Sequence, residues 1–274
     1  MAKRTLRELN KVDEDFELIN KKGYPIVKSN ELVQRSRSHF TKFQNKLISI
    51  ICSKIPAPII SHDGITIEPK EIPLDYEITV QEIMQLRGLS SSGDLYNDIK
   101  ENLKYIRDNS FWIKDAEGRT VTASWLSKVK VNEKMNVVNE DGTKSVQSGD
   151  GKIEYSLDPD IVPYISNIVS KYIKYELYDV LELEKEKAIP LFEYLISNAY
   201  KKTFTVTYDY LKWMLMLDET DTYKQFKFFN RDVLKPTVQE INEKTSYEVE
   251  YMPLGRPVTE IKFLVRKKKY GDEC

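Results

Sequence analysis

The sequence predicts an α+β fold built from two winged-helix domains in tandem, each a helix-turn-helix followed by a β-hairpin wing. The chain has 274 residues, with 41% hydrophobic and 31% charged, which is typical of a globular protein large enough for two domains. One order of elements occurs twice along it: long helix, strand, helix, helix, β-hairpin. Short echoes such as "KLISIICSK" and "YLISNAYKK" also indicate duplication.

The expected organisation is an N-terminal arm over residues 1–27, a first domain over 28–158 and a second over 159–274. The stretch "LDPDIVP" sets the boundary because it interrupts a strand pattern. The arm has neither an apolar signal core nor the composition of a transit peptide, and no apolar run reaches a membrane span, which favours a cytoplasmic protein without membrane contact. A terminus without function explains the arm equally well.

The first domain is expected to begin with one long helix over residues 30–54, which "IPAP" ends. Short β-like pieces follow over residues 59–78. Thr79 and Glu82 have the spacing of a capping box, and Gly88 is placed to end the helix that they start.

A second helix is expected from "SSSGDLYNDIKENLKYIRDNSF", since its apolar residues recur at steps of 4, 4 and 3. These residues are Leu95, Ile99, Leu103 and Ile106. The runs "FWI", "TVTASWLSKVKV" and "KIEYSLDP" predict strands. The polar, glycine-containing stretch 139–151 is expected to be a mobile hairpin tip whose role is open.

The second domain repeats this order: "KEKAIPLFEYLISNAYKK" predicts a helix, "FTVT" a strand and "YDYLKWMLML" a helix. A further helix is expected over residues 222–242. The run "YEVEYMPLGRPVTEIKFLVRKK" then predicts two strands around a Gly-Arg-Pro turn.

The expected helix 222–242 has two faces. Its apolar face is formed by Tyr223, Phe226, Phe229, Val233, Leu234, Val238 and Ile241. Its basic residues recur at steps of 3, 4 and 4, with Asn230 beside them; they are Lys224, Lys227, Arg231 and Lys235. A helix of about 20 residues spans about 30 Å and fits the DNA major groove, where Arg reads guanine, Asn reads adenine and Lys contacts phosphate.

The pattern therefore favours DNA binding, although a solvated amphipathic helix would also show a basic row, which Asp232 and Glu240 dilute here. Pro236 is expected to bend the helix or to restart it. Arg256 lies at the tip of the expected wing, a place for minor-groove or backbone contact. Residues 222–274 hold 11 basic and 8 acidic residues, whereas the whole chain has a net charge of −1.

The first domain offers a weaker copy of this surface. Lys100 and Lys104 lie on the side of its second helix opposite the apolar face. Ser91, in a run of three serines, is placed to hold a phosphate at the helix start. An ordinary serine N-cap explains the same residues equally well.

No catalytic, metal or cofactor site is expected, and the chain does not read as an enzyme. His39 and His62 are the only histidines and do not form a metal pair, which disfavours a strand-nicking initiator. No phosphate-binding GxxxxGK[ST] loop is present, which disfavours an ATP-driven helicase. Cys52 and Cys274 do not suggest a disulfide framework.

Two further patterns have simple interpretations. The tryptophans Trp112, Trp125 and Trp213 lie in apolar runs and are expected in the core rather than as platforms for base stacking. The charge runs "ELEKEK" and "RKKK" are expected to be solvated, although the second is also placed to touch phosphate.

Over residues 28–268 the chain resembles the iteron-binding plasmid replication initiators, which have two winged-helix domains. The most specific stretch is "YKQFKFFNRDVLKPTVQEINEKTSYEVEYMPLGRPVTEIKFLV"; "KSNELV", "ITVQEIMQLRGL" and "YSLDPDIVPYI" also fit. The resemblance implies double-stranded DNA as a partner, both as origin iterons and as an inverted repeat at the gene's own promoter. It also implies origin opening, recruitment of host initiator and helicase proteins, and a monomer–dimer equilibrium with the dimer repressing transcription.

The resemblance also implies which residues contact DNA. In the second domain these are Lys224, Lys227, Asn230, Arg231, Lys235 and Arg256, and in the first domain Ser91, Lys100 and Lys104. Two other functions stay open at this point. One is a winged-helix transcriptional repressor that never starts replication, and the other is a winged-helix protein-interaction module without DNA contact.

Overall fold

The computed structural model describes residues 24–56, 72–86, 95–114, 117–131, 135–138, 144–147, 151–166, 168 and 171–268. Residues 1–23 of the expected N-terminal arm, Gly88 and the serine run that includes Ser91 lie outside these residues, whereas residues 25–27 of the expected arm belong to a strand of the second unit. No helix in the described ranges is long and apolar enough to cross a membrane. The chain divides into two compact units, and the following paragraphs take each by itself.

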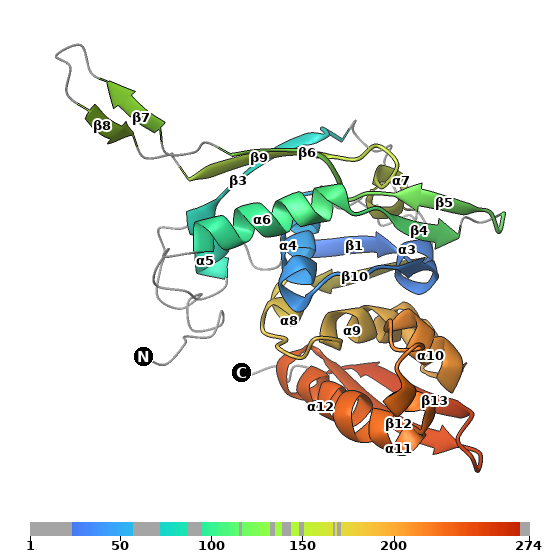
Figure 1. Cartoon of the computed structure of the whole chain (residues 1–274). Helices are drawn as coiled ribbons and strands as arrows, with labels where there is room; N and C mark the ends of the chain where they lie inside the picture. The colour runs from blue at the N-terminus through green and yellow to red at the C-terminus, as the bar shows by residue number, and fades with distance from the viewer. Residues whose placement is uncertain are drawn as a thin grey trace, which may run out of the picture. The chain divides into compact units, whose positions relative to one another are not determined.

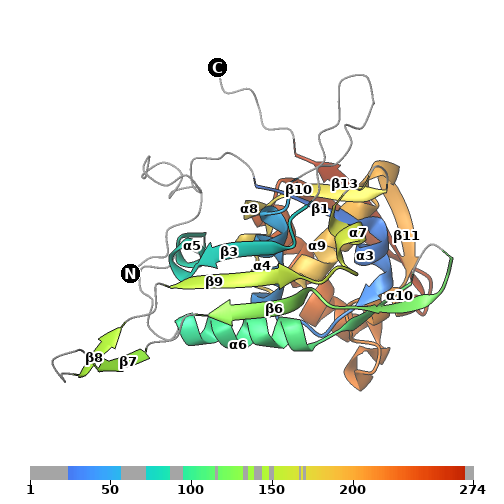
Figure 2. The same cartoon turned by 90° about the horizontal axis from the view of Figure 1, so that it is seen from above.

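The first unit contains a winged helix. Its elements are β3 (Asp75–Thr79), α5 (Val80–Leu86), α6 (Leu95–Asp108), β6 (Leu126–Val131) and β9 (Lys152–Leu157). The three strands form one antiparallel sheet in the order β3-β9-β6, and Figure 2 shows α6 running alongside it.

The expected capping box is confirmed at the start of α5. The Glu82 backbone N–H donates to the Thr79 hydroxyl, and the Thr79 N–H donates to the Glu82 carboxylate, both at 3.0 Å. The predicted apolar face of α6 is also confirmed, since all four of its members are buried: Leu95, Ile99, Leu103 and Ile106.

A separate two-stranded hairpin, β7 (Met135–Val138) and β8 (Lys144–Gln147), lies in the sequence between β6 and β9. It occupies part of the stretch expected to be a hairpin tip. Residues 139–143 and 148–150 of that stretch are outside the described residues.

The second unit begins with a correction. The single helix expected over residues 30–54 is wrong, because the chain forms α3 (Asn30–Arg35), the short strand β2 (Ser36–Arg37) and α4 (Lys42–Ser53). The Thr41 side chain accepts from the Gln44 N–H, and the Gln44 amide accepts from the Thr41 N–H, so a capping box starts a new helix. The "TKFQ" spacing was the signal in the sequence, and the apolar periodicity hid it.

Two small sheets belong to this unit. The strand β1 (Pro25–Ser29) pairs antiparallel with β10 (Tyr172–Glu176). The strands β4 (Phe111–Lys114) and β5 (Thr120–Ala123) form a hairpin that continues β2 in the order β2-β4-β5. Further helices are α7 (Val162–Ile165), α8 (Tyr178–Leu181), α9 (Ala188–Ser197) and the 3-10 turn η1 (Ala199–Lys201).

The second winged helix completes the unit (Figure 1). It comprises β11 (Thr203–Thr207), α10 (Tyr208–Met214), a helical segment ending at Lys244, β12 (Tyr247–Leu254) and β13 (Glu260–Lys267). Its sheet has the order β11-β13-β12, which matches β3-β9-β6 strand for strand. The expected α+β fold with two winged helices is thus confirmed.

The compact units divide the chain differently from the expected domains. Elements β1, α3, α4, β4 and β5, expected in the first domain, group with the second winged helix. The reason is that β1 pairs with β10, and that the β4–β5 hairpin joins the sheet of β2. The boundary between residues 158 and 159 stays a prediction about winged-helix domains rather than a division between these units.

Two surface expectations are also corrected. Trp112 is 59% exposed, because it lies on the outward side of β4, whereas Trp125 is buried as expected and Trp213 is half-buried. In the run "ELEKEK", Glu184 is not merely solvated. Its carboxylate accepts from Lys42 at 2.7 Å and from the buried Lys46 at 2.8 Å.

Candidate nucleic-acid interface

The helix expected over residues 222–242 is built from four pieces. They are the 3-10 turn η2 (Asp221–Lys224), α11 (Phe226–Phe229), the π-helical turn η3 (Asn230–Leu234) and α12 (Lys235–Lys244). Pro236 lies in the first turn of α12, as predicted for a proline that restarts a helix. Proline has no N–H, so Pro236 cannot donate to the carbonyl of Asp232, four residues earlier. Just before it the helix widens into a π turn, in which the Lys235 N–H donates to the Asn230 carbonyl, five residues earlier.

One face of this segment belongs to the core of the unit. Phe229, Val233, Leu234, Val238 and Ile241 are buried, as the sequence predicts. The other expected members, Tyr223 and Phe226, are half-buried. The Phe226 and Phe229 rings both pack against Tyr208 of α10, with centroids 5.5 and 5.2 Å away. The apolar stripe therefore fixes α11 and α12 on the winged helix and leaves the opposite side in solvent.

Lys227, Arg231 and Lys235 are exposed on that opposite side. Residues four apart on a regular α-helix drift by about 40° per step, because one turn holds only 3.6 residues. A π turn holds more residues than an α-turn, so the turn over residues 230–234 offsets part of this drift between Lys227 and Lys235. Within the described residues, neither Lys227 nor Lys235 forms an ion pair.

Lys224 does not belong to this row. It lies in η2, ahead of α11, and pairs with Asp221 at 2.7 Å. The change of backbone direction at Gln225, where φ is −102° and ψ is 122°, separates the two segments. The expected row of four cations is therefore a row of three on the helix and one on the preceding turn.

Arg231 is held by its neighbours. Its Nε donates to Asp232 Oδ1 at 2.5 Å and its Nη2 donates to Oδ2 at 2.9 Å. The guanidinium also lies over the Phe228 ring, 5.2 Å from the centroid. The hydrogen bond between the two side chains raises the pKa of Arg231 and lowers the pKa of Asp232, so both groups are ionised at neutral pH.

Asn230 points toward the wing rather than along the cationic row. Its amide oxygen accepts from the Tyr251 hydroxyl of β12 at 2.6 Å, and the residue is half-buried. This bond ties the π turn to the wing. The sequence placed Asn230 near the basic row, but it could not show that a tyrosine 21 residues later would claim its oxygen.

The wing presents Arg256 in the turn between β12 and β13, where the residue is exposed as expected. Gly255 has φ +91°, and a Cβ there would lie 2.8 Å from the Pro257 carbonyl oxygen, so glycine is required beside Arg256. In the run "RKKK", Arg266 pairs with Glu250 at 2.5 Å, and Lys268 donates to the Thr245 carbonyl at 2.8 Å. Arg266 therefore joins the two wing strands, and Lys268 joins the end of the wing to the end of α12.

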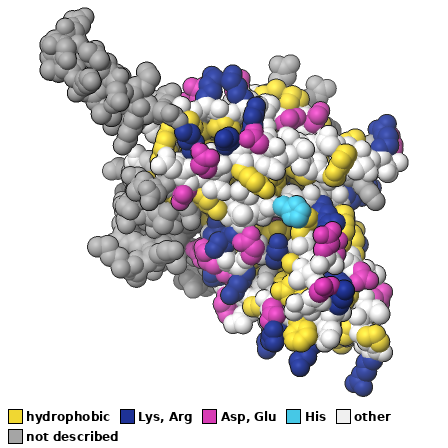
Figure 3. All heavy atoms as spheres, viewed as in Figure 1, with side chains coloured by type: hydrophobic (Ala, Val, Ile, Leu, Met, Phe, Trp, Pro, Cys, Tyr) yellow, Lys and Arg dark blue, Asp and Glu magenta, His cyan; other side chains and the backbone are white. Residues whose placement is uncertain are grey.

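Figure 3 shows how these charges look from outside. Lys and Arg side chains project along the lower edge of the face drawn, where Figure 1 places α11 and the wing. Acidic and apolar side chains are interspersed among them. The cations therefore lie on a surface that also carries acidic and apolar side chains.

In the first unit, Lys104 is exposed on α6 and Lys100 is half-buried on the same helix. Acidic side chains stand among them, at Asp98, Glu101 and Asp108, all exposed. This helix therefore carries a more mixed surface than α11 and α12. The third expected contact of the first domain, Ser91, lies outside the described residues.

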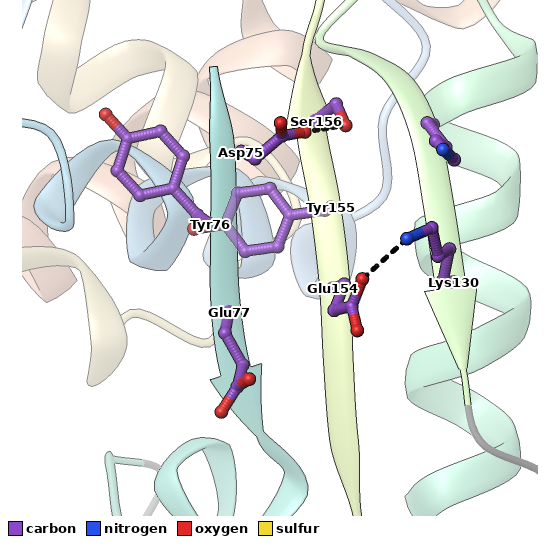
Figure 4. Close-up of a pocket in the computed structure, with 8 residues that line it drawn as sticks. Asp75, Tyr76, Glu77, Lys130, Glu154, Tyr155 and Ser156 are labelled. Atoms are coloured by element: carbon purple, nitrogen blue, oxygen red, sulfur yellow. Dashed lines mark hydrogen bonds and ion pairs between the residues drawn. The ribbon is translucent and has the colours of Figure 1, made fainter. Parts of the chain in front are cut away.

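The outer face of the β3-β9-β6 sheet forms an open hollow of about 370 Å³ (Figure 4). Two ion pairs join neighbouring strands here: Lys130 pairs with Glu154 at 2.8 Å, and Lys152 pairs with Glu77 at 3.1 Å. Tyr76 and Tyr155 stack below them with centroids 5.7 Å apart. Because two of its cations, Lys130 and Lys152, are already paired with carboxylates, this face is a weaker candidate for phosphate than the row of exposed cations on the second winged helix.

No group of three or more His, Cys, Asp or Glu residues suited to a metal ion occurs in the described part of the chain. Cys52 is buried with a free thiol, and burial raises its pKa to about 12. The second winged helix is therefore the best candidate site, and its distinctive features are the row of Lys227, Arg231 and Lys235 and the wing tip at Arg256.

The comparisons with known proteins show the family of the chain. Residues 25–196 match the family described as "Initiator Replication protein, WH1", and residues 207–265 match "Initiator Rep protein, WH2". The chain belongs to this family of replication initiators. The second match runs from the last residue of β11 to within two residues of the end of β13. It therefore contains every residue of the second domain that was expected to contact DNA.

A curated relative of the initiator family is the "Replication initiation protein" of Escherichia coli. It is 29% identical over 126 residues, which cover 44% of this chain and 39% of the relative. The match thus spans well under half the length of that protein. Two crystal structures of domains 2 and 3 of RctB are also similar, each with 12% sequence identity over 83% of this chain. The first has a TM-score of 0.44 and is covered over 83% of its length, and the second has a TM-score of 0.39 and is covered over 82%.

Proposed function

We propose that this replication initiator binds directly repeated duplex DNA at an origin through its second winged helix. In this proposal α11 and α12 enter the major groove, where Arg231 contacts a base and Lys227 and Lys235 contact phosphates. Arg256 on the wing contacts the backbone or the minor groove. The observation that carries the proposal is the row of three exposed cations on a helix whose other face is buried.

The proposal includes the rest of the initiator's work. Binding to several repeats opens an adjacent A+T-rich segment, because bending and crowding strain the duplex. The protein recruits host replication proteins and, as a dimer, represses its own promoter at an inverted repeat. Lys100, Lys104 and Ser91 add backbone contacts from the first domain. The protein itself performs no chemistry on DNA.

The test compares wild type with Arg231→Ala in binding to the DNA that flanks the gene, at about 50 and 200 mM salt. Specific binding should weaken by about 1–3 kcal/mol in the variant, and wild-type affinity should fall steeply with salt. Lys174→Ala is the matched control, because Lys174 is an exposed cation of β10 away from the helix. Its affinity should stay close to wild type.

Other outcomes point to other functions. Equal binding by wild type and Arg231→Ala, or binding by neither, would make the row a solvated face and favour a protein-interaction module. Specific binding without replication of a plasmid that carries the gene and its neighbouring repeats would favour a dedicated repressor.

A further inference from the structure

Arg231 has fewer ways to meet DNA than an unrestrained arginine. Its Nε and one Nη2 proton are taken by Asp232, at 2.5 and 2.9 Å, and one face of the guanidinium lies over Phe228. A guanidinium has five N–H donors in a planar fork. The three that are left lie at the far end of the group, where two parallel N–H bonds fit O6 and N7 of a guanine.

Asp232 also changes what Arg231 should approach. Its carboxylate is ionised and exposed on the same surface of the helix. A phosphate brought to this place meets a like charge, which is destabilising, whereas a guanine edge brings acceptors to Arg231 without a full negative charge. The carboxylate therefore disfavours backbone contact more than base contact.

The backbone places both residues at one point of the helix. Arg231 and Asp232 lie in the π turn, the Asn230 oxygen in that turn is tied to Tyr251 of the wing, and Pro236 follows in the next turn. Short π turns within α-helices are frequent at functional sites. Here the turn is fixed by the wing on one side and by the proline on the other.

We propose that Asp232 is a specificity-determining residue, which holds Arg231 end-on toward a guanine in the major groove and opposes its transfer to a phosphate. This inference rests on the proposed function, because it assigns a role within the same DNA contact. It makes an acidic residue in a cationic row a source of discrimination rather than a dilution of charge.

The test is Asp232→Asn, a change of nearly constant shape that removes the charge. Binding is measured to the flanking DNA and to an unrelated duplex of equal length, over a range of salt. We expect binding to the unrelated duplex to strengthen, and the ratio of specific to unrelated affinity to fall about tenfold. The salt dependence on unrelated DNA should steepen by about one unit, because the released Arg231 contacts a phosphate.

Glu243→Gln is the matched control. Glu243 is an exposed acid of α12 that accepts from Gln239 at 2.8 Å and lies outside the π turn. Its removal should strengthen binding to both duplexes by a similar factor and leave the ratio unchanged. A double-mutant cycle adds a second check. The ratio of specific to unrelated affinity should be the same in the double variant Arg231→Ala, Asp232→Asn as in Arg231→Ala alone.

The outcomes separate the two proposals. If wild type prefers the flanking DNA, but Asp232→Asn keeps the same ratio as Glu243→Gln, the role of Asp232 is refuted and the proposed function stands. A further loss of ratio in the Arg231→Ala background would show that Asp232 does not act through Arg231. If wild type itself does not distinguish the two duplexes, the proposed function is the one that fails.

Discussion

The first and second winged helices share a strand order but differ in what interrupts them. In the first, β4 and β5 lie in the sequence between α6 and β6, and β7 and β8 lie between the wing strands. In the second, α12 leads into β12 after two residues, and β12 turns into β13 through residues 255–259. The apolar pattern, which both share, determines the topology, while the connections vary freely around it.

The surfaces differ more than the topology. The helix α6 is regular and mixes acids with bases, whereas α11 and α12 are joined by a π turn, α12 has a proline in its first turn, and the segment carries three exposed cations. The comparison teaches that one small fold can carry two different surfaces, so that function has to be inferred from the site rather than from the fold.

Charge reversal on each helix should give the largest contrast. Lys227→Glu combined with Arg231→Glu should weaken specific DNA binding by about 100-fold or more, because it replaces two favourable contacts with two repulsive ones. Lys100→Glu combined with Lys104→Glu should cost about tenfold or less, since those residues stand among acids. Titration of the flanking DNA at constant salt measures both, and equal losses would break the proposed division of labour.

Matched cavities should show whether the compact units unfold separately. Ile106 of α6 and Ile241 of α12 are both fully buried, and truncation of either to alanine should cost its own unit about 3 kcal/mol. Hydrogen exchange read by mass spectrometry would locate the loss. If Ile106→Ala lowered the protection of α12 as much as that of α6, the two units would unfold as one.

Replacing Pro236 should make the segment from α11 to α12 a more regular α-helix, like α6. Pro236→Ala restores an N–H that can bond the Asp232 carbonyl and favours a regular α-turn in place of the π turn. Stability should change by only about 1 kcal/mol, whereas specific DNA affinity should fall about tenfold because the cations lose their alignment. Thermal unfolding and DNA titration on one sample give both values, and unchanged affinity would remove the role of the π turn.

Acid should weaken the second unit slightly through Glu184. Burial alone would raise the pKa of this carboxyl, but hydrogen bonds from Lys42 and Lys46 lower it from 4.5 to about 2. Because the folded-state pKa is depressed, the contribution to stability is complete above pH 4.5 and is lost as the pH falls toward 2. Since the side chain is about half exposed, wild type should exceed Glu184→Gln by under about 1 kcal/mol at pH 7, and the difference should vanish near pH 2.

The first unit supplies the control for that experiment. Glu154 pairs with Lys130 at 2.8 Å, and both side chains are more than half exposed. Glu154→Gln should therefore leave stability unchanged within error at every pH. Urea unfolding at pH 7, 4.5 and 2.5 compares the two variants, and a larger effect at Glu154 than at Glu184 would reverse the expectation.

Local patterns carried most of the fold. The capping box at Thr79 and Glu82, the buried face of α6 and the hairpin around Gly255 could all be predicted, because neighbours in sequence determine them. The restart of the helix at α4 also had a local signal, the Thr41–Gln44 spacing, but the strand β2 before it did not, because it depends on pairing with a strand about 75 residues later. The exposure of Trp112 was missed for the same reason, since an apolar residue on a hairpin does not reveal which side will be covered.

The candidate site divides in the same way. The buried face of α11 and α12 and the exposure of Lys227, Arg231 and Lys235 follow from periodicity, and Pro236 was placed correctly at a helix start. The tie between Asn230 and Tyr251 joins a helix to a wing and has no local signature. The pairing of Arg231 with Asp232 did have a local signal, since the two residues are adjacent. In the sequence, however, Asp232 was interpreted only as an acid that dilutes the basic row.

The pairing of β1 with β10 has a consequence for synthesis. The elements of the first winged helix, β3, α5, α6, β6 and β9, all lie between these strands in the chain. At about 5–20 residues per second, β10 is synthesised about 7 to 30 seconds after β1. All strands of the first winged helix are therefore synthesised before β1 has its partner, so the β1–β10 sheet of the second unit is the later of the two to form.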